Sequence, residues 1–285
     1  MSRVVLGFAD GTSFFAGLTM SLVADLLILR FPRKTIRAAL NVLGLAGMVF
    51  VVMSATPLPV LAYAVWLTSA GVSLALGNIA RPGRHLPRIL GALVLVTTAT
   101  FGLAELRHAF LPHLSAPRGT TVYVVGDSIS AGVGSKERCW PAVFAEMTSF
   151  PVVNLAQAGA TVETALRQAD RAVQLNSMVI LEIGGNDILG GTDAATFRER
   201  LDLLVSSLRL HQHRILMLEL PLFPFQNAFG AAQRSVAKQH GCLLLPKRRF
   251  AAVLGAENGT LDGLHLSQKG HDSMAKVLAG VVHVE

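Results

Sequence analysis

The chain has 285 residues, of which 52% are hydrophobic, and its mean hydropathy is +0.50. Soluble domains have a lower hydropathy, so we expect part of the chain to lie in lipid. The net charge of +7 could suggest a nucleic-acid-binding protein, but residues 1–118 hold ten Lys/Arg against three Asp/Glu, whereas residues 119–285 hold fifteen of each. Because the excess positive charge accompanies the apolar half, it indicates membrane topology and argues against nucleic acid as a partner.

Four apolar stretches fill the N-terminal part of the chain, at residues 12–30, 38–56, 59–78 and 89–105. Each is close to the about 20 residues that a helix needs to cross about 30 Å of hydrocarbon. We therefore predict about four transmembrane helices within residues 1–106. Asp25 lies in the first stretch, about 7.5 Å along a helix from Arg30, so we expect it to reach the polar interface or to pair there.

The loops between these stretches alternate in charge. The first and third loops are basic, whereas the second, around Pro57 and Pro59, carries no charge. The positive-inside rule then places the first and third loops in the cytoplasm. An integral protein of a bacterial inner membrane would thus hold everything after the fourth helix in the periplasm. The basic residues are Arg30, Arg33, Lys34 and Arg37 in the first loop and Arg81, Arg84 and Arg88 in the third.

Residues 107–119 are predicted to form a linker, because Pro112 and Pro117 do not continue a helix. From residue 120 onward, short apolar runs alternate with amphipathic segments, which predicts one α/β domain over residues 120–285 with a parallel sheet covered on both faces. The expected strands are 122–125, 152–155, 178–183, 215–220 and 243–245. The expected helices lie near 140–149, 161–174, 194–211, 226–240 and 268–282.

Ser128 follows the first predicted strand directly, in the sequence Gly126-Asp127-Ser128. Ligands of open α/β sheets gather at the carboxyl ends of strands, so the Ser128 hydroxyl is a candidate nucleophile. A serine in this position is also common as a turn or helix-capping residue. Asp127, like Asp187 further along the chain, is expected to stabilise a turn rather than to take part in the chemistry.

Three further segments offer the groups that a nucleophilic serine requires. Asn186, in the sequence Gly-Gly-Asn-Asp after the third strand, can direct its amide at a developing oxyanion, and Gly159 can offer its backbone N–H. Asp262 and His265, before the last helix, can form a base and the partner that orients it. Each segment alone also fits an ordinary turn or loop. Together they supply a nucleophile, an oxyanion hole and a base.

In this order, the segments containing Ser128, Gly159, Asn186 and His265 resemble the GDSL, or SGNH, hydrolase family, and Asp262 completes the triad. The resemblance covers about residues 120–285. The sequence Cys-Trp-Pro-Ala at 139–142 is similar to the bacterial thioesterase, lysophospholipase and arylesterase branch, and an Ile replaces the usual Leu after the serine. The resemblance implies a three-layer α/β/α domain with a mostly parallel five-stranded sheet, and no metal or organic cofactor.

Together these observations predict a membrane-tethered serine esterase acting on an acyl ester of a lipid, a glycan or a small molecule. An acyltransferase that uses the same triad is the alternative, because four helices exceed what an anchor requires. A catalytically inactive scaffold is disfavoured, since such proteins usually lack a triad member. A sensor or transporter module is disfavoured by the few polar groups within the apolar stretches. The oligomeric state is left open.

Segment 221–229 and the two cysteines each allow two interpretations. The residues of segment 221–229 follow the fourth strand, and its three phenylalanines, Phe223, Phe225 and Phe229, either line an acyl pocket or fill the core. Cys139 and Cys242 either form one disulfide in an oxidising compartment or remain small buried side chains; two cysteines cannot form a zinc site.

Overall fold

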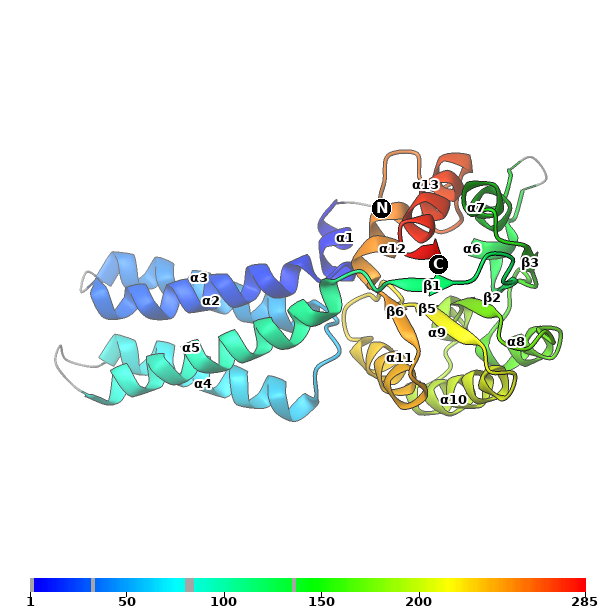
Figure 1. Ribbon diagram of the computed structural model, residues 1–285. Coiled ribbons are helices and arrows are strands. Elements are labelled where there is room, and N and C mark those ends of the chain that lie inside the picture. Colours follow the sequence, from blue (N-terminus) through cyan, green and yellow to red (C-terminus); the bar gives the residue numbers. More distant parts are fainter. Residues whose placement is uncertain (1–2, 32–33, 80–84, 135–136) are drawn as a thin grey trace. The chain divides into compact units, whose positions relative to one another are not determined.

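The computed structural model describes residues 3–31, 34–79, 85–134 and 137–285. The chain divides into two units, which are treated separately (Figure 1). The helical unit comprises Gly7–Ala109 and Leu222–Asn227. The α/β unit comprises Met1–Leu6, Phe110–Pro221 and Ala228–Glu285.

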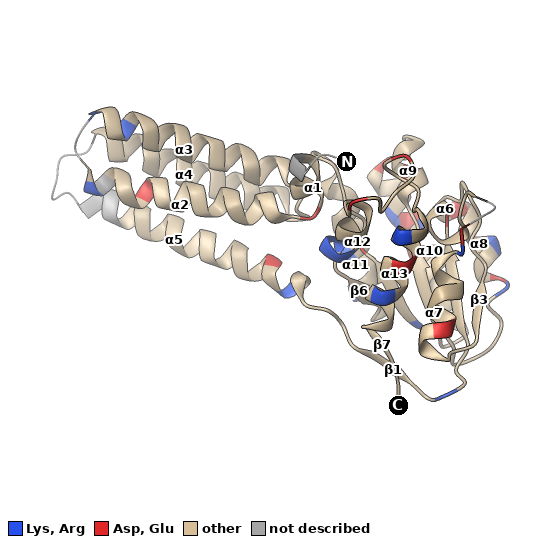
Figure 2. Cartoon of the chain, turned by 90° about the horizontal axis from the view of Figure 1, so that it is seen from above, with Lys and Arg blue, Asp and Glu red and all other residues tan. Residues whose placement is uncertain are grey.

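In the described part of the chain, four long helices form the helical unit: α2 (Thr12–Arg30), α3 (Lys34–Met53), α4 (Val60–Ile79) and α5 (His85–Leu106). They coincide with the four predicted apolar stretches; α1 (Arg3–Ala9) precedes them and the short 3-10 helix η1 (Arg107–Ala109) follows. Three segments, Lys34–Met53, Val60–Ile79 and Ile89–Ala109, are long and apolar enough to cross a membrane, whereas the apolar part of α2, Thr12–Ile28, is shorter. Figure 2 shows that charged residues are sparse along these helices.

Small residues let α2 and α3 approach closely. A Cβ added at Gly17 would lie 2.5 Å from the carbonyl oxygen of Gly47, and one at Gly47 would lie 2.5 Å from Oγ of Ser21. Ser21 also donates a hydrogen bond of 3.2 Å to the carbonyl of Gly44. Glycines and a hydroxyl therefore hold this helix pair together, as is common where two helices pack in an apolar environment.

Asp25, expected to reach a polar interface or to pair there, faces the inside of the helical unit. Its side chain is buried, next to Ser73 of α4. The reason is its position on the helix, because Ser21, Ala24 and Ile28 on the same side of α2 are buried as well. The predicted topology rests in part on Arg33, Arg81 and Arg84, which lie outside the described residues.

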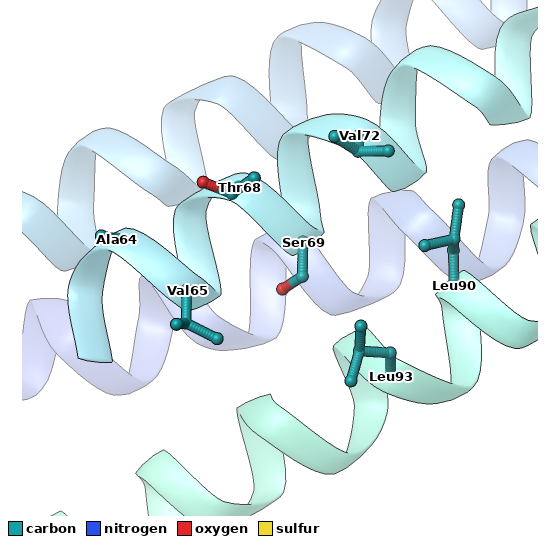
Figure 3. Close-up of a pocket in the computed structure, with 7 residues that line it drawn as sticks. All are labelled: Ala64, Val65, Thr68, Ser69, Val72, Leu90 and Leu93. Atoms are coloured by element: carbon teal, nitrogen blue, oxygen red, sulfur yellow. The ribbon is translucent and has the colours of Figure 1, made fainter. Parts of the chain in front are cut away.

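An open hollow of about 430 Å³ lies between α4 and α5 (Figure 3). Val65 and Ser69 of α4 point toward α5, while Leu90 and Leu93 of α5 point toward α4. The lining is mostly apolar and contains no titratable side chain, so it offers no acid, base or charged group for catalysis. The full lining is Ala64, Val65, Thr68, Ser69, Val72, Leu90 and Leu93.

The α/β unit is built on a parallel five-stranded sheet, as the apolar runs predict. Its described strands follow the order β3-β2-β4-β5-β6, and every neighbouring pair is parallel. Their bounds are β2 Val122–Gly126, β3 Val152–Asn154, β4 Met178–Glu182, β5 Arg214–Leu218 and β6 Leu243–Leu245. Strands β2 and β4 are buried along their whole length, because both faces of a parallel sheet are covered.

Helices lie on both faces of this sheet (Figure 1). Helix α13 packs against both α7 and α12, and α8 packs on α10. The bounds are α6 Ser128–Ala131, α7 Trp140–Thr148, α8 Val162–Ala169, α9 Gly185–Leu189, α10 Ala194–Leu210, α11 Asn227–His240, α12 Lys247–Leu254 and α13 Gln268–Ala279. The chain steps from β2 to β3 on one side and then crosses to β4 on the other. The carboxyl ends of β2 and β4 therefore flank a topological switch point, where ligands of open α/β sheets bind.

A second, two-stranded sheet was not predicted. Strand β1 (Leu114–Ala116) lies within the stretch expected to be a linker, and it pairs in parallel with β7 (Val282–Val284). The last helix accordingly ends at Ala279 rather than near residue 282. Leu114 and Ala116 are both buried, so the segment that follows the helices packs as part of the α/β unit.

Candidate active site

Ser128 lies at the carboxyl end of β2, as the sequence predicts. Helix α6 begins at this residue, and Asp127 caps it by accepting a hydrogen bond of 2.9 Å from the backbone N–H of Ile129. Ser128 is half-buried. The buried side chain of Gln168, on α8, holds the end of the strand by bonding both the N–H and the carbonyl of Gly126, at 2.9 and 3.0 Å. The serine therefore sits on a turn that is fixed from two sides.

Asn186 lies in α9, directly after β4. Gly184, with φ of +117°, turns the chain out of the strand, and a Cβ there would lie 2.8 Å from the ring of Phe197. The side-chain amide of Asn186 donates to the carbonyl of Ala160 at 2.9 Å and to Oδ2 of Asp127 at 3.3 Å. The amide thus joins the turns that follow β2, β3 and β4.

Gly159 lies in the turn after β3, next to the Ala160 carbonyl that Asn186 contacts. Its φ is +77°, a conformation that favours glycine, and the residue is exposed. Asp187 also joins these turns, since its Oδ2 accepts a hydrogen bond of 2.9 Å from the N–H of Val162, at the start of α8. This contact joins two segments 25 residues apart, so it differs from the local turn role expected for Asp187.

Asp262 and His265 form a hydrogen-bonded pair on the loop before α13. Nδ1 of His265 lies 2.7 Å from Oδ2 of Asp262, and Oδ1 of Asp262 accepts the backbone N–H groups of Leu264 and His265. The hydrogen bond with the His265 side chain has the largest effect on the pKa of Asp262. Together with the two backbone bonds, it holds this pKa well below its ordinary value. An ionised Asp262 fixes the tautomer of His265 that carries its proton on Nδ1, and leaves Nε2 free to accept another.

His265 lies near the turn that carries Asp127 and Ser128. Burial raises the pKa of Asp127, the residue before Ser128, to about 6, and the nearby charge of His265 opposes part of that rise, so the histidine loop lies close to the turn after β2. Among the described residues, no hydrogen bond joins the Ser128 hydroxyl to His265. Such contacts are often long in an unliganded enzyme and shorten when substrate binds.

A buried carboxyl pair under this turn was missed at the sequence level. Glu182, the last residue of β4, is paired in register with Gly126 and is hydrogen-bonded to the carboxyl group of Asp127. The signal was present, because Glu182 is an acidic residue inside an otherwise apolar predicted strand. Asp127 is therefore more than a local turn residue: it contacts Glu182, Ile129 and Asn186.

Cys139 and Cys242 are free thiols, and that of Cys139 donates to the carbonyl of Ala131. Phe229 packs on Phe197 with ring centroids 5.2 Å apart, whereas Phe223 and Phe225 are 46% and 73% exposed and do not fill a core. Within the described residues, no group of three or more His, Cys, Asp or Glu side chains could hold a metal ion.

Comparison with known families decides the kinship of the chain. The model of the GDSL-like lipase/acylhydrolase family matches residues 124–272. The chain belongs to this family. The match spans all five strands of the main sheet except the start of β2, together with every predicted site residue, while helices α2–α5 lie outside it.

Relatives within the GDSL-like family support the assignment. Esterase TesA of Pseudomonas aeruginosa is 30% identical over 160 residues, which cover 51% of this chain and 79% of that protein. The Escherichia coli K12 protein named thioesterase 1/protease 1/lysophospholipase L1 is 26% identical over 182 residues, covering 59% and 88%. A crystal structure of TesA matches with a TM-score of 0.50 and 26% identity, covering 56% of this chain and 97% of that one. The GDSL-like part of the chain is thus a hydrolase of the kind that acts on ester bonds.

Proposed function

We propose that the α/β unit hydrolyses acyl esters through a triad of Ser128, His265 and Asp262. The observation that carries the proposal is the 2.7 Å contact between Asp262 and His265, which orients the ring and leaves Nε2 able to take a proton. The position of Ser128 at the switch point of a GDSL-like sheet supports its role as the nucleophile.

The reaction follows from these groups. Nε2 of His265 takes the hydroxyl proton of Ser128 while Oγ attacks the carbonyl carbon of the ester, and Asp262 stabilises the imidazolium that forms. The backbone N–H groups of Ser128 and Gly159 and the Asn186 amide stabilise the oxyanion. The intermediate collapses as His265 returns the proton to the leaving oxygen, which gives an acyl-enzyme and a free alcohol. Water then attacks the acyl-enzyme by the same sequence of steps.

The substrate we propose is an acyl ester carried by a lipid or a glycan. The related proteins are named as an esterase and as a thioesterase and lysophospholipase, and these activities share an acyl group attached through oxygen or sulfur. We favour a lipid because four apolar helices accompany the α/β unit in the same chain.

The test is a p-nitrophenyl ester series of increasing chain length, measured on the full chain in detergent beside Ser128→Ala. The substitution should lower kcat by about 10³-fold or more, because the nucleophile is lost while the oxyanion hole remains. Hydrolysis that persists at the parental rate in Ser128→Ala would overturn the proposal. A fluorophosphonate probe, which should label the parent and not the variant, reports the same serine without requiring the right ester.

We further propose that residues 1–106 anchor the protein in a bacterial inner membrane and that residues 107–119 lead to a periplasmic catalytic domain at 120–285. Within the part of the chain that the structure describes, three helices long and apolar enough to span a membrane support the anchor. A reporter fused after Glu285 that is active in the periplasm and inactive in the cytoplasm is the expected result. Activity in the cytoplasm alone would reverse the proposed orientation.

An acyltransferase is the second candidate, because four helices exceed what one anchor requires. The same acyl-enzyme would then be resolved by a hydroxyl group of a second substrate instead of water. Labelling of Ser128 by a fluorophosphonate, without ester hydrolysis and with acyl transfer to an added glycan, would favour this candidate.

A further inference from the structure

Two carboxyl groups are buried next to each other at the turn that carries Ser128. Asp127 is 3% exposed and Glu182 is 1% exposed. Their side chains are hydrogen-bonded, and Glu182 also accepts a bond of 2.8 Å from Oγ of Ser130. A Cβ at Gly126 would lie 3.1 Å from Oε2 of Glu182, so the strand end leaves room for this carboxyl.

A hydrogen bond between two carboxyl groups requires a proton, because ionised carboxylates only accept. The surroundings keep that proton in place. Burial raises the pKa of Asp127 to about 6, and burial together with the neighbouring Asp127 raises the pKa of Glu182 well above its ordinary value. The charged groups that face Asp127 are His265, from the loop before α13, and Asp187, from α9, and their effects oppose each other.

The pair reaches the proposed oxyanion hole through Asn186. One amide hydrogen of Asn186 is held by the carbonyl of Ala160 at 2.9 Å, and the other by Asp127 at the longer distance of 3.3 Å. An oxyanion bound by this amide would compete with Asp127 for the second hydrogen. Negative charge on Asp127 would strengthen the competing bond and would also repel the oxyanion.

We propose that Glu182 is a positioning residue that donates a shared proton to Asp127 and so limits the negative charge behind Asn186. The inference rests on the proposed function, in which Asn186 binds the oxyanion. When the pair loses its proton at alkaline pH, two adjacent carboxylates would face the oxyanion hole. Because the oxyanion exists in the transition state and not in the bound substrate, kcat should fall while KM changes little.

The deciding variant is Glu182→Gln in the full chain, since an amide still donates to Asp127 but cannot ionise. In the parent, we expect kcat to decline as the pair loses its shared proton with rising pH; in Glu182→Gln this decline should be absent. Glu182→Leu, which has no donor, should lose about tenfold or more in kcat across the whole pH range with KM nearly unchanged. An alkaline decline that is the same in the parent and in Glu182→Gln would overturn the proposal.

Glu219 provides a matched control. It is also a buried glutamate just beyond the end of a neighbouring strand, β5, but it is paired with Arg234 at 2.6 Å instead of with a carboxyl group. Glu219→Gln should therefore lower the melting temperature without changing the pH profile of kcat. If this control alters the alkaline decline as Glu182→Gln does, the effect is a general result of destabilisation and the proposal fails.

A measurement in the Ser128→Ala background separates this proposal from the proposed function. A carboxyl group whose pKa is raised in the folded state stabilises the fold fully below its unfolded pKa, and that contribution is lost as the pH rises through the folded pKa. Glu182→Gln should therefore gain melting temperature relative to its own parent as the pH is raised from about 5 to 9. It should also remove the infrared band of a protonated carboxyl group at neutral pH. Absence of both effects would overturn the shared proton, whether or not Ser128 is the nucleophile.

Discussion

Buried polar groups are used differently in the α/β unit and in the helical unit. In the α/β unit several of them lie where strands end: Asp127, Glu182 and Asp187 lie at the carboxyl ends of β2 and β4, and bond to groups on other loops. In the helical unit most of them are hydroxyls that bond within or between helices, as Ser21 does with the carbonyl of Gly44. Trp66 and Thr98 join α4 to α5 in the same way, at 2.9 Å.

This difference separates the buried polar groups that can take part in a reaction from those that stabilise packing. Groups that converge from several loops can act together on one substrate, whereas hydroxyls that satisfy helix carbonyls stabilise the contacts between helices. Changes to the loops of the α/β unit should therefore alter turnover, and changes to helix contacts should alter stability with little effect on turnover.

Asp262→Asn should have the largest effect on turnover. If turnover survived, the contrast between the two units would be wrong. The amide cannot hold the reactive tautomer of His265 or stabilise its imidazolium, so kcat should fall by about 10³- to 10⁴-fold. Because the pKa of Asp262 is held below its ordinary value of 3.8, its contribution to stability is present above that value and is lost as the pH falls through the folded pKa. Steady-state kinetics near neutral pH measure the expected loss.

Asp193→Asn is the control for this prediction. Asp193 is likewise an exposed aspartate whose hydrogen bonds lower its pKa, but it caps α10 by accepting from Ala195 and Thr196. Its variant should keep kcat within about twofold of the parent. Equal losses in the two variants would show that a structural effect of Asp-to-Asn substitution, and not a triad, explains the result.

Asn186→Ala should have the next largest effect. Loss of one oxyanion donor lowers kcat by about 10²- to 10³-fold with a smaller change in KM. In the Ser128→Ala background the same substitution should cost far less, because residues that act as a unit are not additive. Full additivity in the double variant would contradict a shared role in one reaction step.

Much of the fold and of this site could be predicted because the signals are local. Strands β2 and β4 are apolar runs that end in glycine-containing turns, and the site residues follow these runs. Strands β1 and β7 escaped prediction because each has three residues and a distant partner. The apolar residues around Val281 also continue the pattern of α13, which hides the end of that helix.

Glu182 was missed for a different physical reason. In the sequence Glu182 is one polar residue in an apolar run, and its neighbours in the sequence do not indicate which side chain it contacts. Its role depends on the parallel register that sets Glu182 opposite Gly126, and on the turn that brings Asp127 above it. The burial of Asp25 could not be predicted for a similar reason, since only the packing of α2 shows that its side of the helix is buried.

Gly47→Ala tests the helical unit, where a change to a helix contact should lower stability and leave turnover nearly unchanged. The added Cβ would lie 2.5 Å from Oγ of Ser21 and 2.7 Å from the carbonyl of Gly17, so α2 and α3 must separate. Overpacking of this kind costs about 1–3 kcal/mol, which thermal unfolding in detergent would measure. Hydrolysis of a short, soluble ester at low temperature should stay within about twofold of the parent, because no reacting group changes.

The matched control is Gly71→Ala on α4, where the added Cβ meets nothing within 4 Å. Alanine is the better helix former by about 1 kcal/mol, so this variant should be as stable as the parent or more stable. If both variants lowered stability equally, loss of glycine itself, and not the close contact of α2 with α3, would be the cause.

The smallest effect concerns the exposed phenylalanines of the segment Leu222–Asn227. Because Phe223 and Phe225 are not used to fill a core, their rings are free to contact an acyl chain, which would gain from burial of apolar surface. Phe223→Ser and Phe225→Ser should each raise KM by a few-fold for long-chain esters and leave acetyl esters nearly unchanged, as measured over the same p-nitrophenyl series.

Phe229→Ser is the contrast, since its ring packs on Phe197 and its loss should lower stability before it alters chain-length preference. An equal rise in KM for acetyl and long-chain esters in the first two variants would show that these rings do not select the acyl chain.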